Sequence, residues 1–327
     1  MTKFQQRFLF LLLLIVATSG AIIYFTVDIH TLQYLTAFQP VSIVLALLFL
    51  TIGMYFDGTR LTRLVNIAGE RISFSQAMQV IFGNYFLAML TPGAAGGAVA
   101  QVMFLRRAGV PLGKATVLVL VRTLMSILFL LICMPAVFYL DAELVPWLSP
   151  DLLALISVVL VLGSLGSLVF FRTRFALHWV LRLTRRMKYG RRRRWFRLYR
   201  DIRGAVLLLS RSPKQVAIVF VESGASLLSL YAMVPALFWG LGAVFDWIPV
   251  MGRMIFLNLL LYFAPTPGGS GVAEGGFIFL FGSWLPAGTV GVLAVAWRTL
   301  AEYLPFTIGF YYTIQVFGRD FLAKALK

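Results

Sequence analysis

The sequence has few charged side chains and few of the residues on which catalytic and metal sites depend. Charged residues make up 13% of the 327 residues, against about 25% in an average soluble domain. The chain has one cysteine, Cys133, and two histidines, His30 and His178. A single cysteine excludes an intrachain disulfide, and no HExxH motif, P-loop or cluster of metal-ligating residues is present. The sequence therefore lacks the signatures of a zinc protease and of an ATP-driven pump.

An intramembrane serine protease is also disfavoured. Residues 268–271 read GGSG, which fits the G-x-S-G pattern of rhomboid proteases. A nucleophilic serine there needs a histidine base within the membrane, and both histidines fall in predicted loops. We therefore predict a protein that is not an enzyme and that binds no cofactor and no metal.

Long apolar runs are what the sequence does contain. Hydrophobic residues make up 60% of the chain, and the mean hydropathy is +0.89. A core of this chain length cannot hide that much apolar surface from water, so we predict an all-α polytopic membrane protein with one membrane domain, 1–327. About 20 apolar residues cross a bilayer as a helix. Six stretches are predicted to be full spans: 8–27, 40–56, 113–140, 151–171, 213–242 and 286–317.

Two further apolar regions, 76–106 and 254–283, are each interrupted by a Pro-Gly stretch. The first interruption reads LTPGAAGGAVA (90–100) and the second PTPGGSGVAEGG (265–276). Proline lacks an N–H and glycine tolerates unusual backbone angles, so a helix stops there. Irregular backbone at membrane depth is tolerated only where it is buried in protein or lines a watery cavity. We therefore predict two re-entrant helical hairpins with their tips near the middle of the membrane.

The distribution of charge predicts the orientation of the chain. In this layout nearly all of the 29 basic residues fall on one side, including Arg60 and Arg63 after the 40–56 span. That side is the cytoplasm by the positive-inside rule, so both termini are cytoplasmic. Arg253 is expected to face outside, beside Asp246. The first hairpin then enters from the cytoplasm and the second from outside.

The two interrupted regions form part of a predicted repeat. The sequence TPG occurs at 91–93 and at 266–268, and the sequence Arg-Thr-Leu follows at 122–124 and at 298–300, so the two offsets are nearly equal. Together with the opposite entry sides, this predicts inverted-topology repeats with cores at 72–140 and 250–317. Inverted repeats whose broken helices meet at the midplane are typical of transporters.

The breaks predict an anion-binding site. A helix broken in the membrane presents free N–H groups and a positive dipole end, which suit phosphate. Arg122 and Arg298 lie within spans at equivalent positions, and guanidinium binds phosphate in a bidentate way. The predicted substrate-binding residues are Arg122, Arg298, Glu274, Thr91, Pro92, Gly93, Gly96, Thr266, Pro267, Gly268, Gly269 and Gly271.

Structural roles compete with these assignments. Arg298 has Glu302 four residues later, the right spacing for an ion pair, whereas Arg122 has Ser126 there. Glu274 pairs with an arginine or carries a coupling proton. Four residues are therefore assigned coupling or structural roles, with both asparagines expected to hydrogen-bond backbone freed by the breaks: Glu222, Glu302, Asn84 and Asn258.

A basic segment at 172–203, within a cytoplasmic linker predicted at 172–212, contains thirteen basic residues and one acidic residue, Asp201. It directly follows a span and has Phe, Trp and Leu interleaved with the charges. We predict that it lies on anionic lipid rather than on nucleic acid. Docking of a partner protein on it stays open.

The two TPGG-like breaks, the PTPGGSGVAEGG stretch with its acidic residue and the basic central segment resemble the lysylphosphatidylglycerol synthase transmembrane-region family. The resemblance covers nearly the whole chain and implies lipid translocation or a link to lipid and glycolipid biogenesis. Bifunctional members carry a soluble aminoacyl-transferase domain after the membrane part. The chain ends at Lys327, so we expect no synthesis of lysylated lipid.

These observations together predict a flippase- or scramblase-like lipid translocator in a bacterial-type inner (cytoplasmic) membrane. The expected cargo is an anionic phospholipid or a polyprenyl-phosphate-linked lipid, moved passively or by an ion gradient or the membrane potential. The alternative is a non-transporting scaffold or regulatory subunit for a lipid or glycan biosynthesis enzyme. A homo-oligomer and a complex with a biosynthetic enzyme both stay open.

Overall fold

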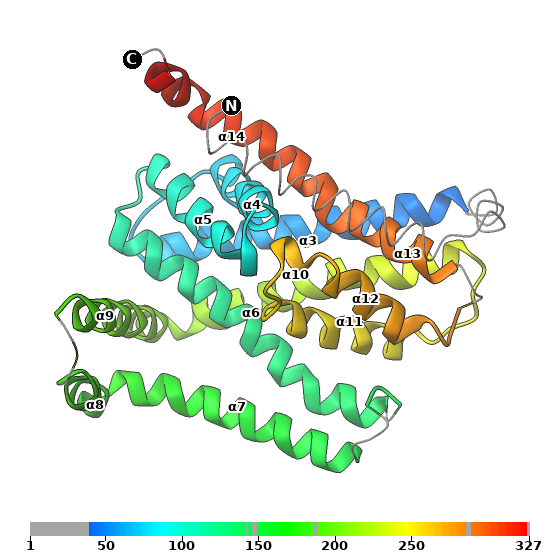
Figure 1. Ribbon diagram of the computed structural model, residues 1–327, viewed down its shortest axis with the longest axis horizontal. Coiled ribbons are helices and arrows are strands. Elements are labelled where there is room, and N and C mark those ends of the chain that lie inside the picture. Colours follow the sequence, from blue (N-terminus) through cyan, green and yellow to red (C-terminus); the bar gives the residue numbers. More distant parts are fainter. Residues whose placement is uncertain are drawn as a thin grey trace.

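The computed structural model describes residues 39–325 except 142, 146–148, 186, 188 and 286–288. The span predicted at 8–27 lies outside the described residues. Within them the chain forms helices and turns and no strand (Figure 1). The α-helices are α3 (Pro40–Ile67), α4 (Phe74–Met89), α5 (Ala95–Arg107), α6 (Leu112–Leu140), α7 (Pro150–Arg172), α8 (Arg174–Thr184), α9 (Tyr189–Arg211), α10 (Pro213–Gly240), α11 (Trp247–Leu261), α12 (Val272–Phe281), α13 (Thr289–Arg298) and α14 (Leu304–Ala325).

Three of these helices, α3, α6 and α10, are long and apolar enough to cross a membrane, which supports the prediction of a helical membrane protein. The predicted end of the second span at residue 56 is wrong, because α3 continues to Ile67. Arg60 and Arg63 therefore lie on this helix and not in a cytoplasmic loop. The helix continues past Asp57 because Asp57 and Arg60 pair with each other and are 5% and 4% exposed.

The order of elements in 40–140 recurs in 213–325. Each part begins with a 28-residue helix that starts at a proline, α3 or α10. A shorter helix follows (α4 or α11), then a 3-10 turn at the Pro-Gly break, η1 (Pro92–Ala94) or η2 (Pro267–Gly269), and a second short helix (α5 or α12). The last helix is α6 in the first part. In the second part α13 and α14 take its place, joined by a π-helical turn, η3 (Thr299–Tyr303).

Helices α3 and α10 pack closely and run antiparallel. The Gln39 amide donates to the Gly240 carbonyl at 2.9 Å, and the Ser226 hydroxyl donates to the Gly53 carbonyl at 2.9 Å. Residue numbers thus rise along one helix as they fall along the other. A Cβ atom on Gly53 would lie 2.8 Å from Leu230 Cγ, so a side chain there would force the helices apart.

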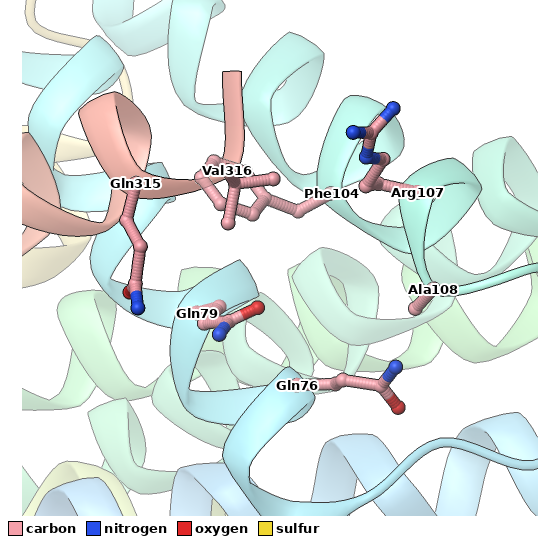
Figure 2. A pocket seen from close by; sticks show the side chains of 7 residues that line it. All are labelled: Gln76, Gln79, Phe104, Arg107, Ala108, Gln315 and Val316. Carbon is pink, nitrogen blue, oxygen red and sulfur yellow. The ribbon is translucent and has the colours of Figure 1, made fainter. Parts of the chain in front are cut away.

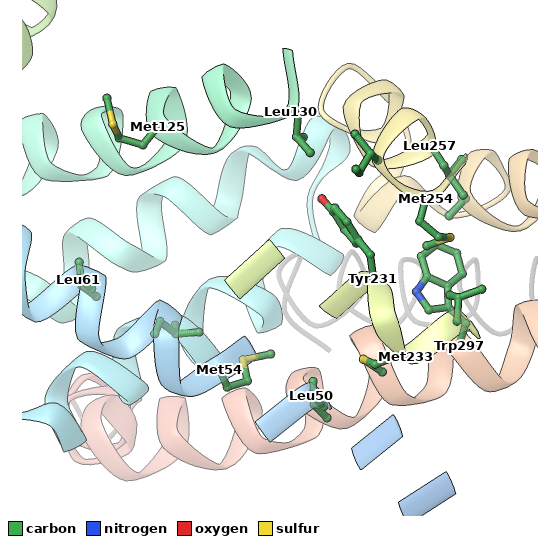
Figure 3. Close-up of a cluster of buried hydrophobic side chains, with 14 of the residues drawn as sticks. Leu50, Met54, Leu61, Met125, Leu130, Tyr231, Met233, Met254, Leu257 and Trp297 are labelled. Carbon is green, nitrogen blue, oxygen red and sulfur yellow. The ribbon is translucent and has the colours of Figure 1, made fainter. Parts of the chain in front are cut away.

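The two parts also exchange contacts through their other helices. Helix α4 packs against α14, and α11 packs against α6. Buried side chains from α3, α6, α10, α11 and α13 fill the interior, among them Met54, Met125, Tyr231, Met254 and Trp297 (Figure 3). Helices α7, α8 and α9 lie together at the edge of the bundle beyond α6 (Figure 1). The breaks are therefore held between interlocked helices.

Both Pro-Gly stretches end a helix as predicted, and they do so with nearly the same backbone. Gly93 has φ 62° and ψ 24°, and Gly268 has φ 57° and ψ 17°. The following residue also has a positive φ in both breaks: 69° at Gly269 and 51° at Ala94. A left-handed conformation costs a residue with a Cβ about 1 to 2 kcal/mol. The first break therefore carries backbone strain at Ala94. The second break has glycine at the equivalent position, Gly269, and avoids this strain.

Replacing Ala94 by glycine should stabilise the protein. The strain energy removed at positive φ is larger than the free-energy cost of ordering a more flexible glycine on folding. We therefore expect the free energy of unfolding to rise by about 0.5 to 1 kcal/mol. Ala98→Gly is the matched control, because Ala98 is exposed within α5 and glycine inside a helix costs about 0.5 to 1 kcal/mol. Thermal midpoints in one detergent should shift in opposite directions, and equal losses would contradict the strain at Ala94.

Candidate functional site

The two breaks touch each other. The Gly93 amide donates to the Pro265 carbonyl at 3.2 Å, and an added Cβ on Gly268 would lie 3.2 Å from Met89 Cα. The N–H of Gly93 has no acceptor within its own broken helix and finds one on the other break. Tertiary structure therefore brings together the predicted residues Thr91–Gly93 and Thr266–Gly268.

The short helices after the breaks begin in different ways. In the first break the Thr91 hydroxyl donates to the Leu87 carbonyl at 2.9 Å and accepts from the Gly96 amide at 2.7 Å. In the second, the Glu274 carboxylate accepts from the Gly271 amide at 2.7 Å. An acidic side chain near a helix N-terminus is stabilised by the helix dipole. The N-terminus of α12 is thus satisfied by a charged group and that of α5 by a neutral one.

A first ion cluster joins α3, α5 and α6 and consists of Asp57, Arg60 and Arg122. Arg122 Nη2 and Nε bind the two oxygens of Asp57, the latter at 3.2 Å, and Arg122 Nη1 donates to Gln101 Oε1 at 2.9 Å. Arg60 Nε donates to Asp57 Oδ1 at 2.5 Å and Arg60 Nη1 donates to Ser126 Oγ at 3.0 Å. Two guanidinium groups share one carboxylate, so the cluster carries one excess positive charge.

Sequence reasoning missed Asp57 and Gln101. It found no acidic residue one helical turn from Arg122, whereas the partner is 65 residues away on α3. The signal that was available is the acidic residue directly after the apolar run 40–56. Every nitrogen of the Arg122 side chain that can donate has a protein acceptor in this arrangement.

A second ion cluster lies at the second break and consists of Arg298, Glu274 and Glu302. Arg298 Nε donates to Glu274 Oε1 at 3.2 Å, and Arg298 Nη2 donates to the Gly268 carbonyl at 2.9 Å. Glu302 Oε1 lies 3.6 Å from Arg298 Nη1, which is an ion pair beyond hydrogen-bond distance. The i, i+4 pair expected as the structural alternative is thus present but loose. Two carboxylates surround one guanidinium, so this cluster carries one excess negative charge.

Unpaired donors gather at the second break. In the part of the chain that the structure describes, four buried side-chain atoms have no hydrogen-bond partner, and three of them are Thr266 Oγ1, Ser270 Oγ and Arg298 Nη1. Ser270 is 5% exposed and Arg298 is 1% exposed. Buried polar groups in proteins are nearly always hydrogen-bonded, and all three of these groups can donate. The second break therefore presents open hydrogen-bonding capacity for an acceptor such as phosphate.

Tyr85 on α4 lies near both clusters, within electrostatic range of Asp57, Arg122 and Glu302. The predicted asparagines form bonds away from the breaks. Asn84 Oδ1 accepts from Gln101 Nε2 at 2.8 Å, and Asn258 Nδ2 donates to the Met254 carbonyl of its own helix at 2.9 Å. Their described bonds thus hold helices rather than broken backbone.

Two other charged pairs lie away from the breaks. Glu222 on α10 receives Arg63 Nη2 at 2.9 Å and Nε at 3.1 Å, and this bidentate pair ties α3 to α10. Arg253, which was expected to face outside beside Asp246, forms its ion pair with Asp141. Its Nε donates to Asp141 at 2.7 Å, and its guanidinium lies 3.6 Å from the centre of a Trp284 ring. Packing of α11 against the end of α6 decides that partner.

A separate cavity of about 230 Å³ lies between α4, α5 and α14 (Figure 2). Its amides and one guanidinium can hydrogen-bond a polar headgroup. It contains none of the predicted site residues. The lining residues are Gln76, Gln79, Phe104, Arg107, Ala108, Gln315 and Val316.

Asp57→Asn should destabilise the protein by about 3 to 5 kcal/mol, because it leaves the Arg60 and Arg122 guanidinium groups buried without a counter-charge. We expect Arg122→Gln and Asp57→Asn to be non-additive, with a coupling of about 0.5 to 3 kcal/mol in a double-mutant cycle.

The matched control for this cycle is the exposed Glu70–Lys114 pair, whose side chains are 26% and 46% exposed. Its coupling should stay below about 1 kcal/mol. Unfolding in mixed micelles measures both cycles. A coupling for Asp57–Arg122 no larger than that of the control would show that the buried pair does not hold α3 to α6.

Comparisons with known proteins support a common family. The family described as "Lysylphosphatidylglycerol synthase TM region" matches residues 10–309. A UPF0104 membrane protein from Archaeoglobus fulgidus is 23% identical over 259 residues, which are 75% of this chain and 77% of that protein. The resemblance predicted from the two breaks is thereby confirmed. The chain belongs to the lysylphosphatidylglycerol synthase transmembrane-region family.

Proposed function

We propose that the protein is a flippase- or scramblase-like lipid translocator of the cell inner membrane that binds the phosphate of an anionic lipid headgroup at the paired helix breaks. The observation that carries this proposal is the group of three buried, unpaired donors at the second break: Thr266 Oγ1, Ser270 Oγ and Arg298 Nη1. Phosphate oxygens accept several hydrogen bonds at once, and guanidinium and hydroxyl groups are suitable donors. The N-terminus of α5 begins at the first break, has no acidic residue in its first turn and adds a favourable dipole.

Arg122 is proposed as the second contact to the lipid. Its cluster has one excess positive charge, which an arriving phosphate would offset in a medium of low dielectric constant. Because Arg122 is already bound to Asp57 and Gln101, the headgroup has to displace the neutral Gln101 from Nη1. Arg298 Nη1 has no hydrogen bond to give up and is held only by the looser ion pair with Glu302. We therefore assign initial binding to the second break and the later contact to Arg122.

The proposal includes inverted repeats with cores at 72–140 and 250–317. Antiparallel packing of α3 against α10, the first helices of the two parts, supports opposite orientations in the membrane. The direct contact of η1 with η2 supports a single shared site. The residues of the first break from Pro92 to Ala95 are exposed. Since irregular backbone at membrane depth does not face lipid, this favours a watery cavity there.

A scaffold for a lipid or glycan biosynthesis enzyme is the second candidate. The observation in its favour is the direct contact of the breaks, in which Gly93 and Pro265 are joined by a hydrogen bond. A closed contact of this kind suits a rigid structural core. Transport requires the same contact to open, so the two candidates differ in whether lipid moves.

The basic segment is proposed to lie on the anionic lipid surface. It forms α8 and α9. Phe175, Trp179 and Leu183 are 73%, 62% and 53% exposed and follow one another at four-residue spacing. They therefore form an apolar stripe on α8, next to basic residues on the same helix. Interfacial helices combine these two features.

Ser270→Ala should reduce transport without reducing stability. The Ser270 hydroxyl has no hydrogen-bond partner in the described part of the chain, so its removal breaks no internal bond. A hydrogen bond to a charged group contributes about 1.5 to 3 kcal/mol, and about 1.4 kcal/mol corresponds to tenfold. We therefore expect a loss of about tenfold or more in the initial rate for labelled phosphatidylglycerol in proteoliposomes.

The matched control is Ser283→Ala, because Ser283 is exposed beyond the end of α12. Labelled phosphatidylcholine tests headgroup selectivity, and Arg298→Gln should abolish transport where it folds. Wild-type rates in a folded Ser270→Ala protein would remove this hydroxyl from the site. A wild-type protein that moves no lipid would favour the scaffold.

The inverted arrangement predicts that equivalent loops lie on opposite sides of the membrane. Arg71 follows α3 and Val244 follows α10, and both are exposed. Arg71→Cys should react with an impermeant maleimide from the cytoplasmic side and Val244→Cys from the outer side, each in a Cys133→Ala background. Reaction of both from the same side of oriented vesicles would show that the two parts are not inverted.

A further inference from the structure

Arg298 is held unequally by its two carboxylates. Both oxygens of Glu274 are used, one by Arg298 Nε and one by the Gly271 amide. Among the residues that the structure describes, Glu302 has one ion pair, with Arg298 Nη1 at 3.6 Å. The Glu302 side chain is 27% exposed, while those of Glu274 and Arg298 are 2% and 1% exposed. Glu302 is therefore the carboxylate that is less firmly bound and less buried.

The local backbone at Glu302 is unusual. It lies in the π-helical turn η3, which directly follows Arg298 and joins α13 to α14. π-helical turns contain an extra residue relative to α-helix and occur frequently at functional sites. This turn places Glu302 near Nη1 without a hydrogen bond. A small movement of η3 is thus enough to form or break the pair.

We propose that Glu302 is the proton-binding residue that couples headgroup binding to proton movement. When Glu302 is ionised it pairs with Arg298 Nη1, and when a proton from water binds its carboxylate it releases Nη1 to the lipid phosphate. This inference rests on the function proposed above and adds its energy coupling. One proton accompanies each singly charged headgroup.

Charge balance supports this coupling. The cluster of Arg298, Glu274 and Glu302 has a net charge of −1 when all three are ionised. Adding a monoanionic headgroup alone would raise the buried negative charge to −2, which is costly in a medium of low dielectric constant. Adding a proton together with the headgroup leaves the charge at −1. The proton therefore removes the electrostatic barrier to binding.

The groups around Glu302 favour a proton over a metal cation. Arg298 lies 3.6 Å from it and would repel a cation. Both carboxylate oxygens of Glu274 on α12 already accept hydrogen bonds. From α4, Tyr85 lies within electrostatic range, and Tyr303 lies beside the Arg298 guanidinium at 5.9 Å. Helix α3 also packs on the π turn, and its acidic residue Asp57 is held by two arginines.

The test measures labelled phosphatidylglycerol transport by the full chain in proteoliposomes as a function of pH. We expect the wild-type rate to rise as the pH falls, by at most about tenfold per pH unit for a single proton. Glu302→Gln fixes this side chain in a neutral form. It should transport at alkaline pH at the rate that the wild type reaches at acidic pH, with no pH dependence. Glu70→Gln, in the exposed pair with Lys114, should keep the wild-type profile.

A wild-type pH profile in folded Glu302→Gln overturns the coupling and leaves the proposed function in place. Absence of wild-type transport at every pH overturns both. A second measurement does not depend on the folding of any variant: a pH dye in the lumen of wild-type proteoliposomes should report proton movement in step with lipid. Lipid movement without proton movement, or a requirement for sodium in place of the pH dependence, also overturns the coupling.

Discussion

Ionised side chains stay buried in this bundle because opposite charges from other parts of the chain hold them. An unpaired charge at the centre of a membrane helix costs about 2.5 to 3.5 kcal/mol on insertion scales, so helix packing has to bring partners together. Asp57 joins α3 to α6 through Arg122, and Glu274 joins α12 to α13 through Arg298. The positions of these helices and the chemistry of the two clusters therefore depend on each other.

The same constraint acts on the backbone at the two breaks. A helix that stops inside a membrane leaves N–H groups without acceptors, and the amide of Gly93 is satisfied by the carbonyl of Pro265 on the other break. Each break thus supports the other. They are not equivalent, because the first is exposed and the second contains the buried donors of Ser270 and Arg298. Similar backbone therefore presents different chemistry on the two sides of one contact.

Much of the architecture could be predicted from local sequence. The helical membrane class and the ends of the helices at both TPG stretches follow from apolar run lengths and from the properties of proline and glycine. The family was indicated by the resemblance of the two breaks and the basic segment to known members. The end predicted for the 40–56 span was wrong, because the apolar run stops before an acidic residue and the helix continues past it. In the fold that residue, Asp57, is buried against Arg60 and Arg122. Nothing in the run itself distinguishes a buried charge from a boundary charge.

The sequence by itself determined where helices begin and break, because those limits depend on backbone chemistry within a few residues. It also marked Arg122 and Arg298 as charges that need partners. Only the tertiary structure decided which partners they have, because Asp57 and Glu274 are 65 and 24 residues away along the chain. It also decided that one cluster has excess positive charge and the other excess negative charge. Net charge at a buried site is a property of which helices meet, and no single stretch of sequence contains it.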